Sequence, residues 1–137
     1  MKHMLDKVKN IIDELQLVDW SNPSGYQLDA KQGLLASYLA NVGSDVARAR
    51  YDYEAKKFNA KTAEAEEYLE LRQSMTSKDA EMKAKLNTRD VYAEYLEAEK
   101  KYQQLKAIYD AMQSMIVSCQ VALKTMEYER KNSGMAR

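Results

Sequence analysis

The chain has 137 residues, a length typical of one domain, and its 21 basic residues balance its 21 acidic residues. It contains only four glycines and one proline, and neither residue type occurs between Ser44 and Ser133. Because sheet folds need frequent turns, this distribution excludes a β-sandwich, a β-barrel and an α/β nucleotide-binding fold.

The first predicted element is a short helix over residues 2–18, in which apolar residues recur at helical spacing. The segment from Asp19 to Gly25 is the strongest loop signal in the chain, because it contains Asn-Pro and Ser-Gly turn dipeptides. We expect its tryptophan, Trp20, to anchor packing. A second, long helix is predicted over residues 27–73.

A short third helix is predicted over residues 77–86, and Thr76 or Ser77 is expected to cap its start. The last helix is predicted over residues 89–131. Its apolar residues alternate steps of four and three through five heptads, which is the pattern of a coiled-coil seam. The seam consists of Val91, Tyr95, Ala98, Tyr102, Leu105, Tyr109, Met112, Ile116, Cys119, Leu123 and Met126.

The helix lengths indicate the architecture. A helix of about 43 residues spans about 64 Å, whereas a compact globule of this size measures about 37 Å. We therefore predict a single all-α domain over residues 1–137, built as a long antiparallel helical hairpin or coiled coil with a short N-terminal helix. One hairpin leaves part of its apolar stripes uncovered. We expect a homo-oligomer whose contacts use the seam from Tyr102 to Leu123; core packing is the alternative interpretation.

Catalytic and metal-binding chemistry lacks the required residues. One histidine, His3, excludes a Ser-His-Asp triad and a two-histidine metal motif, and one cysteine, Cys119, excludes a disulfide framework and a cysteine-cluster zinc site. The glutamates at 64, 66, 67 and 70 are expected to form a solvated face. We predict no enzyme activity, no cofactor and no metal ion. No apolar run approaches the roughly 20 residues of a membrane span, so we expect no membrane partner and a cytoplasmic location.

Basic side chains form two clusters, and aromatic residues interleave with the first. Cations suit phosphates and aromatic rings suit unstacked bases, so this composition is compatible with binding to single-stranded DNA. The candidate DNA-binding residues are Arg48, Arg50, Lys56, Lys57, Lys61, Lys78, Lys83, Lys85 and Arg89, and the candidate stacking residues are Tyr51, Tyr53 and Phe58. Because carboxylates dilute both clusters, a mixed-charge solvated surface is the alternative.

Residues 44–131 resemble the UvsY-like family of small helical phage recombination mediators. The resemblance depends on a Glu-Met-Lys-x-x-Leu segment and on an approximate Cys-x-x-Ala-Leu stretch. These are matched by Glu81, Met82, Lys83 and Leu86, and by Cys119, Ala122 and Leu123. The family carries a Lys-x-Arg DNA-contact segment where this chain has Thr62 and Glu64, and Lys57 and Lys61 are the nearest substitutes.

The resemblance implies a ring-like homo-oligomer, a hexamer or heptamer, that binds single-stranded DNA. It would help a RecA-type recombinase to load onto DNA occupied by a single-strand-binding protein, in the host cytoplasm if the chain is phage-encoded. The alternative is a helical protein–protein interaction protein, such as a phage inhibitor or an assembly or virion scaffold, without a nucleic-acid site.

Overall fold

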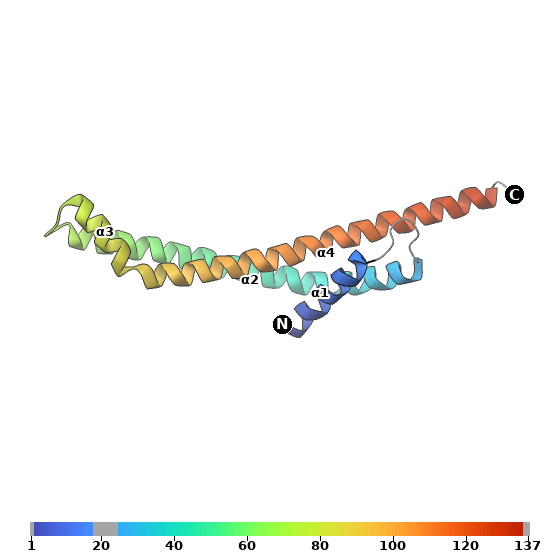
Figure 1. Cartoon of the computed structure of the whole chain (residues 1–137), viewed down its shortest axis with the longest axis horizontal. Helices are drawn as coiled ribbons and strands as arrows, with labels where there is room; N and C mark the ends of the chain where they lie inside the picture. Colours follow the sequence, from blue (N-terminus) through green and yellow to red (C-terminus); the bar gives the residue numbers. More distant parts are fainter. Residues whose placement is uncertain (1, 18–24, 136–137) are drawn as a thin grey trace. The chain divides into compact units, whose positions relative to one another are not determined.

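The computed structural model describes residues 2–17 and 25–135. Within these ranges the chain forms four helices and no strand, which confirms the all-α prediction (Figure 1). The helices are α1 (Lys2–Gln16), α2 (Gly25–Leu71), α3 (Ser77–Asn87) and α4 (Arg89–Met135). Residues 19–24 of the predicted loop, with Trp20, lie outside the described residues, and Gly25, expected to end this loop, is instead the first residue of α2.

The chain divides into two compact units. The first combines Met1–Ser44 with Lys106–Arg137, and the second consists of Asp45–Leu105. Helices α2 and α4 each contribute one segment to each unit, whereas α1 belongs to the first unit and α3 to the second.

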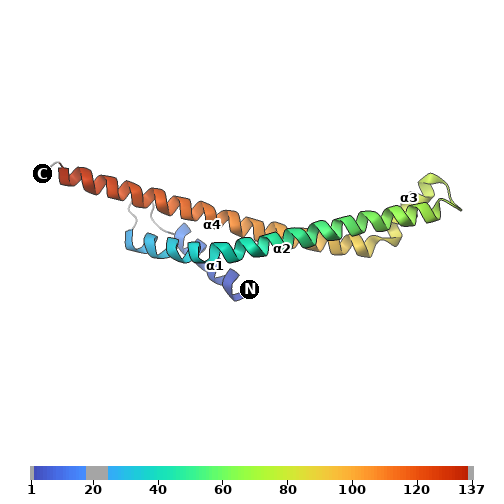
Figure 2. The ribbon, with the colours of Figure 1, turned by 180° about the vertical axis from the view of Figure 1, so that it is seen from behind.

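The core of the first unit is formed by one apolar face of each of its three helical segments. In α1 the buried residues Val8, Ile11, Ile12 and Leu15 are spaced by 3, 1 and 3 positions, which places their side chains on one face of the helix. Figures 1 and 2 both show α1 beside the α2 and α4 segments of this unit. The largest completely buried side chains are Leu15, Leu35, Met112, Val8, Val42 and Cys119. Lys31 of α2 also forms an ion pair with Glu14 of α1. Burial raises the pKa of the Cys119 thiol, because it disfavours the thiolate.

The predicted seam of α4 packs within a single chain. Leu105 and Met112 are only 4% and 0% exposed, and Cys119 is 0% exposed. The backbone of α2 comes close to the seam in the first unit, where a Cβ on Gly43 would lie 3.2 Å from the Tyr109 ring. These three side chains are already covered by the chain itself. A contact between two protein chains through the seam therefore stays a prediction for its half-buried members, Tyr102, Tyr109, Ile116 and Leu123.

In the second unit the α2 and α4 segments run antiparallel. Tyr53 stacks on Tyr102, and nearer the α2–α3 connection Glu64 accepts a hydrogen bond from Tyr92. The number of residues between the two contacting partners therefore decreases toward α3, as expected for two antiparallel segments. The expected cap is confirmed, because the Thr76 hydroxyl accepts a hydrogen bond of 3.3 Å from the backbone N–H of Asp79.

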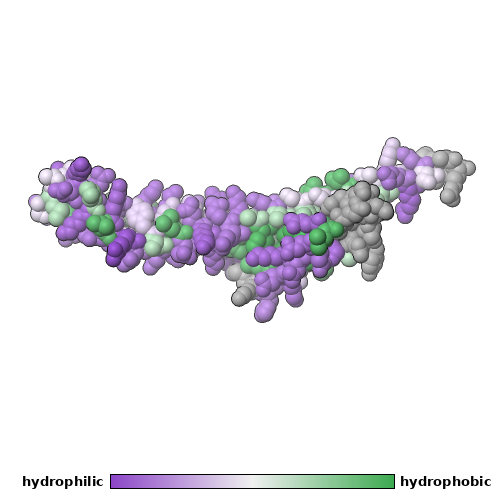
Figure 3. All heavy atoms as spheres, in the orientation of Figure 1, coloured by the Kyte–Doolittle hydropathy of each residue, from purple (hydrophilic) through white to green (hydrophobic). Residues whose placement is uncertain are grey.

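Hydrophilic side chains cover most of the face drawn in Figure 3, and hydrophobic atoms gather mainly beside α1. None of the helices in the described part of the chain is long and apolar enough to cross a membrane.

Candidate nucleic-acid interface

Two adjoining hollows lie where α2, α3 and α4 meet in the second unit. One has a volume of about 500 Å³ and the other about 420 Å³, and both are lined by Glu64 and Tyr92. We call the pair the α2–α3–α4 groove. The remaining lining residues are Lys61, Ala65, Tyr68, Glu81 and Ala84 in the first hollow and Lys85, Arg89, Ala93 and Leu96 in the second. Each hollow therefore combines at least one cation and one aromatic ring with small or apolar side chains.

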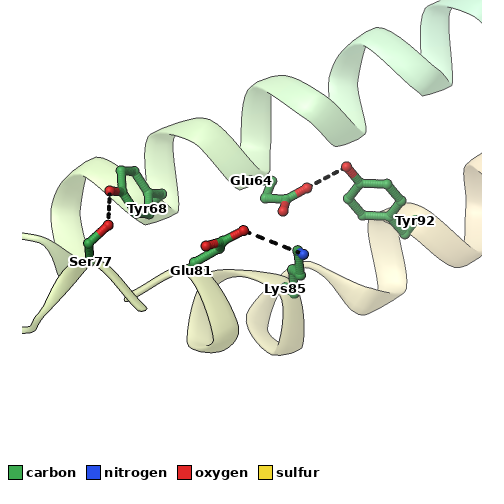
Figure 4. Close-up of polar contacts among 6 residues, drawn as sticks. All are labelled: Glu64, Tyr68, Ser77, Glu81, Lys85 and Tyr92. Atoms are coloured by element: carbon green, nitrogen blue, oxygen red, sulfur yellow. Dashed lines mark hydrogen bonds and ion pairs between the residues drawn. The ribbon is translucent and has the colours of Figure 1, made fainter. Parts of the chain in front are cut away.

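Hydrogen bonds from α2 hold α3 at one wall of this groove. The hydroxyls of Tyr68 and Ser77 lie 3.0 Å apart at the start of α3 (Figure 4). At its other end, the Asn87 amide donates to the Glu67 carboxylate at 2.8 Å. Ala80 and Ala84 are completely buried, so small side chains allow α3 to pack closely. The wall is thus attached to α2 at both ends of a short helix.

Thr88 joins α3 to α4 and fixes where the second wall begins. Its hydroxyl donates to the Ala84 carbonyl at 2.7 Å, while its own carbonyl accepts from the Tyr92 N–H at 3.1 Å. Thr88 therefore supplies a hydrogen-bond partner to a backbone carbonyl in the last turn of α3 and to a backbone N–H in the first turn of α4. Tyr92 consequently lies one turn into α4, with its side chain toward α2.

The central polar contact of the groove joins Tyr92 to Glu64. The phenol hydroxyl of Tyr92 donates to the Glu64 carboxylate (Figure 4). This hydrogen bond, with a smaller contribution from burial, raises the pKa of the Tyr92 phenol above its ordinary value of 10.0. The contact orients the tyrosine ring across the groove and occupies part of the carboxylate that would repel a phosphate.

The structure brings three of the nine candidate DNA-binding residues to the groove, namely Lys61, Lys85 and Arg89. Lys78 and Lys83 are exposed on α3 outside its lining. The other candidates, Arg48, Arg50, Lys56 and Lys57, lie on α2 and line neither hollow.

Four candidates are paired with carboxylates of their own helix. The N···O distances are 4.0 Å for Arg48–Asp45, 3.3 Å for Arg50–Glu54, 3.3 Å for Lys56–Asp52 and 3.7 Å for Lys85–Glu81. Lys85 and Glu81 are 63% and 61% exposed, and such exposed pairs contribute about 0–1 kcal/mol. A phosphate can therefore exchange with Glu81 for the Lys85 ammonium at little cost.

The five remaining candidates, Lys57, Lys61, Lys78, Lys83 and Arg89, form no ion pair within the described ranges. Lys57 lies 5.9 Å from the centre of the Tyr53 ring, a cation–π distance. At the groove, Lys61 and Arg89 thus form no close ion pair within the described ranges, while Glu64 lines both hollows and Glu81 lines the first.

The three stacking candidates differ in exposure. The Tyr53 ring packs against Tyr95 and Tyr102, with both ring centroids 5.6 Å away, and it is half-buried. Tyr53 is therefore engaged inside the fold and does not offer a free face to a base. Tyr51 and Phe58, at 79% and 70% exposure, remain accessible.

The predicted solvated face of four glutamates is wrong for two of them. Glu64, which lines the groove, and Glu67, which holds the end of α3, are both half-buried and hydrogen-bonded; Glu66 and Glu70 are exposed as expected. Glu64 and Tyr92 are 28 positions apart, so no short motif connects them. The described residues contain no cluster of metal-ligating side chains.

Comparison of the chain with protein-family models, with curated proteins and with solved structures finds no match.

Proposed function

We propose that this protein is a non-catalytic, phage-type recombination mediator that binds single-stranded DNA through the α2–α3–α4 groove. In this proposal the chain forms a long antiparallel helical hairpin that assembles into a homo-oligomer. The observation that carries the proposal is the presence of three cations and two tyrosine rings in the lining of two hollows that share Glu64 and Tyr92. The resemblance of residues 44–131 to UvsY-like mediators supports the same interpretation.

The chemistry of the groove suits a flexible strand with little sequence preference. Lys85 and Arg89 line the same hollow from either side of the α3–α4 junction, four positions apart in the chain, and would contact phosphates of one strand. The ring of Tyr92 and the side chain of Leu96 provide apolar area beside them, on which a base can stack whatever its identity. Repetition of a weak site over several subunits would raise the overall affinity by avidity. Strand positioning of this kind would help a RecA-type recombinase to nucleate on DNA that a single-strand-binding protein occupies.

Titration of a labelled oligothymidylate by fluorescence anisotropy, at about 50 and 200 mM salt, tests the DNA-binding proposal. The informative variant is Lys85→Ala with Arg89→Ala, and the matched control is Lys100→Ala with Lys101→Ala. The control removes the same charge from exposed positions on α4 that line neither hollow. Each phosphate contact contributes about −0.7 to the slope of log affinity against log salt, so the groove variant should bind less tightly with a flatter slope.

The outcomes separate the two candidate functions. If the unmodified protein does not bind at about 50 mM salt, the mediator proposal fails, and a helical interaction protein without a nucleic-acid site replaces it. That alternative is favoured by the Glu64 and Glu81 carboxylates, which line the same groove. Equal losses in the groove and control variants would show that binding is not localised in the groove. Stimulation of a RecA-type recombinase on protein-covered single strands would test the mediator step itself.

A further inference from the structure

The part of helix α4 that belongs to the first unit carries a second stripe, on the side away from the seam. Its members step by 4, 3, 4, 3 and 4 residues: Asp110, Ser114, Val117, Val121, Lys124 and Tyr128. At about 100° per residue, Val121 lies half a turn from the buried Met112, and Val117 lies about 140° from it. We call these six residues the α4 outer stripe.

The apolar members of the α4 outer stripe are exposed, and charged residues are absent around them. Val117, Val121 and Tyr128 are 56%, 58% and 66% exposed. Although 31% of the chain is charged, residues 111–123 contain no charged side chain. Single exposed apolar side chains are ordinary on protein surfaces, but depletion of charge around them is typical of the core of a protein–protein interface. This face of α4 therefore suits contact with another protein chain.

The charges at the two ends of this uncharged region indicate what covers it. Asp110 and Lys124 lie seven residues before and seven residues after Val117, and both side chains are exposed. Neither forms an ion pair within the described ranges. A second α4 that runs antiparallel about a two-fold axis at Val117 places Asp110 of each copy at the height of Lys124 of the other. A parallel copy would instead place each of these charges against itself, which is unfavourable.

We infer that the α4 outer stripe pairs with the α4 outer stripe of a second copy of the chain, antiparallel and about a two-fold axis at Val117. In this register Val117 lies against Val117 of the second copy, and Val121 lies at the height of Gln113. The two-fold axis produces the ion pair between Asp110 and Lys124 twice, once at each end of the uncharged region. The stripe is thus complementary to itself in the antiparallel direction.

This pairing names one contact of the homo-oligomer in the proposed function, and in that respect it rests on it. The contact is distinct from the seam, because the α4 outer stripe lies on the opposite side of the helix. It does not depend on DNA binding, because none of the six residues lines the α2–α3–α4 groove. Apolar contact between the valines supplies the affinity, whereas the two ion pairs select the direction.

The test measures the mass of the full chain by light scattering and its dissociation by analytical ultracentrifugation, both without DNA. We expect the unmodified protein to have at least twice the 15.8 kDa chain mass. Val117→Asp places two carboxylates at the two-fold axis and should weaken association by about tenfold or more. Helix content by circular dichroism should stay unchanged, because Val117 is more than half exposed. The matched control is Phe58→Asp, at a position 70% exposed on α2 in the second unit, which should not change the mass.

Charge reversal tests the direction of the pairing. Asp110→Lys alone places two cations together at each end of the contact, and Lys124→Asp alone places two carboxylates together. Each variant should therefore associate about tenfold less tightly than the unmodified protein. A one-to-one mixture of the two variants restores both ion pairs of an antiparallel pair and should associate as the unmodified protein does. In a parallel pair, the same mixture would associate more tightly than the unmodified protein.

Four results would overturn the pairing. They are a monomeric unmodified protein, an association constant that Val117→Asp leaves unchanged or that Phe58→Asp lowers equally, a mixture that stays dissociated, and a mixture that associates more tightly than the unmodified protein. DNA binding is measured separately by the anisotropy titration. Failure of the pairing therefore leaves the DNA proposal standing, and failure of DNA binding leaves the pairing standing.

Discussion

Two adjacent leucines of α2 offer a sharp test of the core of the first unit. Leu35 is 0% exposed, whereas its neighbour Leu34 is 48% exposed. The substitutions Leu35→Ala and Leu34→Ala remove the same atoms from the same helix. Their intrinsic helix propensities therefore change equally, and the difference between the two variants reports burial alone.

The structure determines the expected size of that difference. Truncation of a completely buried leucine costs about 2–5 kcal/mol, because the lost transfer free energy is joined by a cavity term. Leu34 keeps about half of its surface in water and should lose about 1 kcal/mol, half of the transfer free energy of a leucine side chain. We thus expect Leu35→Ala to be the less stable variant by at least about 1 kcal/mol.

Urea unfolding followed by circular dichroism at 222 nm measures this difference. With a denaturant slope of about 1–3 kcal/mol/M, the midpoint of Leu35→Ala should lie about 0.3–1 M or more below that of Leu34→Ala. Equal midpoints, or a lower midpoint for Leu34→Ala, would refute the packing of α2 described above.

Three further predictions concern local features. Gly33→Ala should stabilise the protein by about 0.5–1 kcal/mol, since an added Cβ meets nothing within 4 Å, whereas Gly43→Ala should gain less because its Cβ would lie 3.2 Å from a tyrosine ring; urea midpoints compare them. The Tyr92 phenolate, measured as the 295 nm absorbance that is lost in Tyr92→Phe, should appear only above pH 10, and Glu64→Gln should lower the pKa of Tyr92. Because the pKa is raised in the folded state, the hydrogen bond to Glu64 contributes stability below pH 10 that is lost as the pH rises further. Ionisation of Tyr92 at or below pH 10 would contradict its contact with Glu64. Thr76→Ala should cost about 1 kcal/mol through loss of the α3 cap, with Thr76→Ser close to the unmodified protein in the same assay.

The helices and the buried face of α4 follow from the sequence alone. Both are determined by residues that are near one another in the sequence. The scarcity of glycine and proline allows long helices, and the heptad spacing of apolar residues determines which face of α4 is buried. All eleven members of the predicted seam are buried or half-buried. The Thr76 cap was equally predictable, since a threonine before a helix satisfies a backbone N–H only three residues away.

The tertiary structure decided which helix faces meet and which charges remain available. Tyr51 and Tyr53 are two positions apart and were equivalent as stacking candidates, yet helical rotation places one in solvent and the other against Tyr95. Glu64 meets Tyr92 only because α2 and α4 run antiparallel around α3. Sequence spacing determines the face on which a side chain lies within its own helix, whereas its partner on another helix depends on how the chain returns. The groove and its contacts therefore became visible only with the tertiary structure.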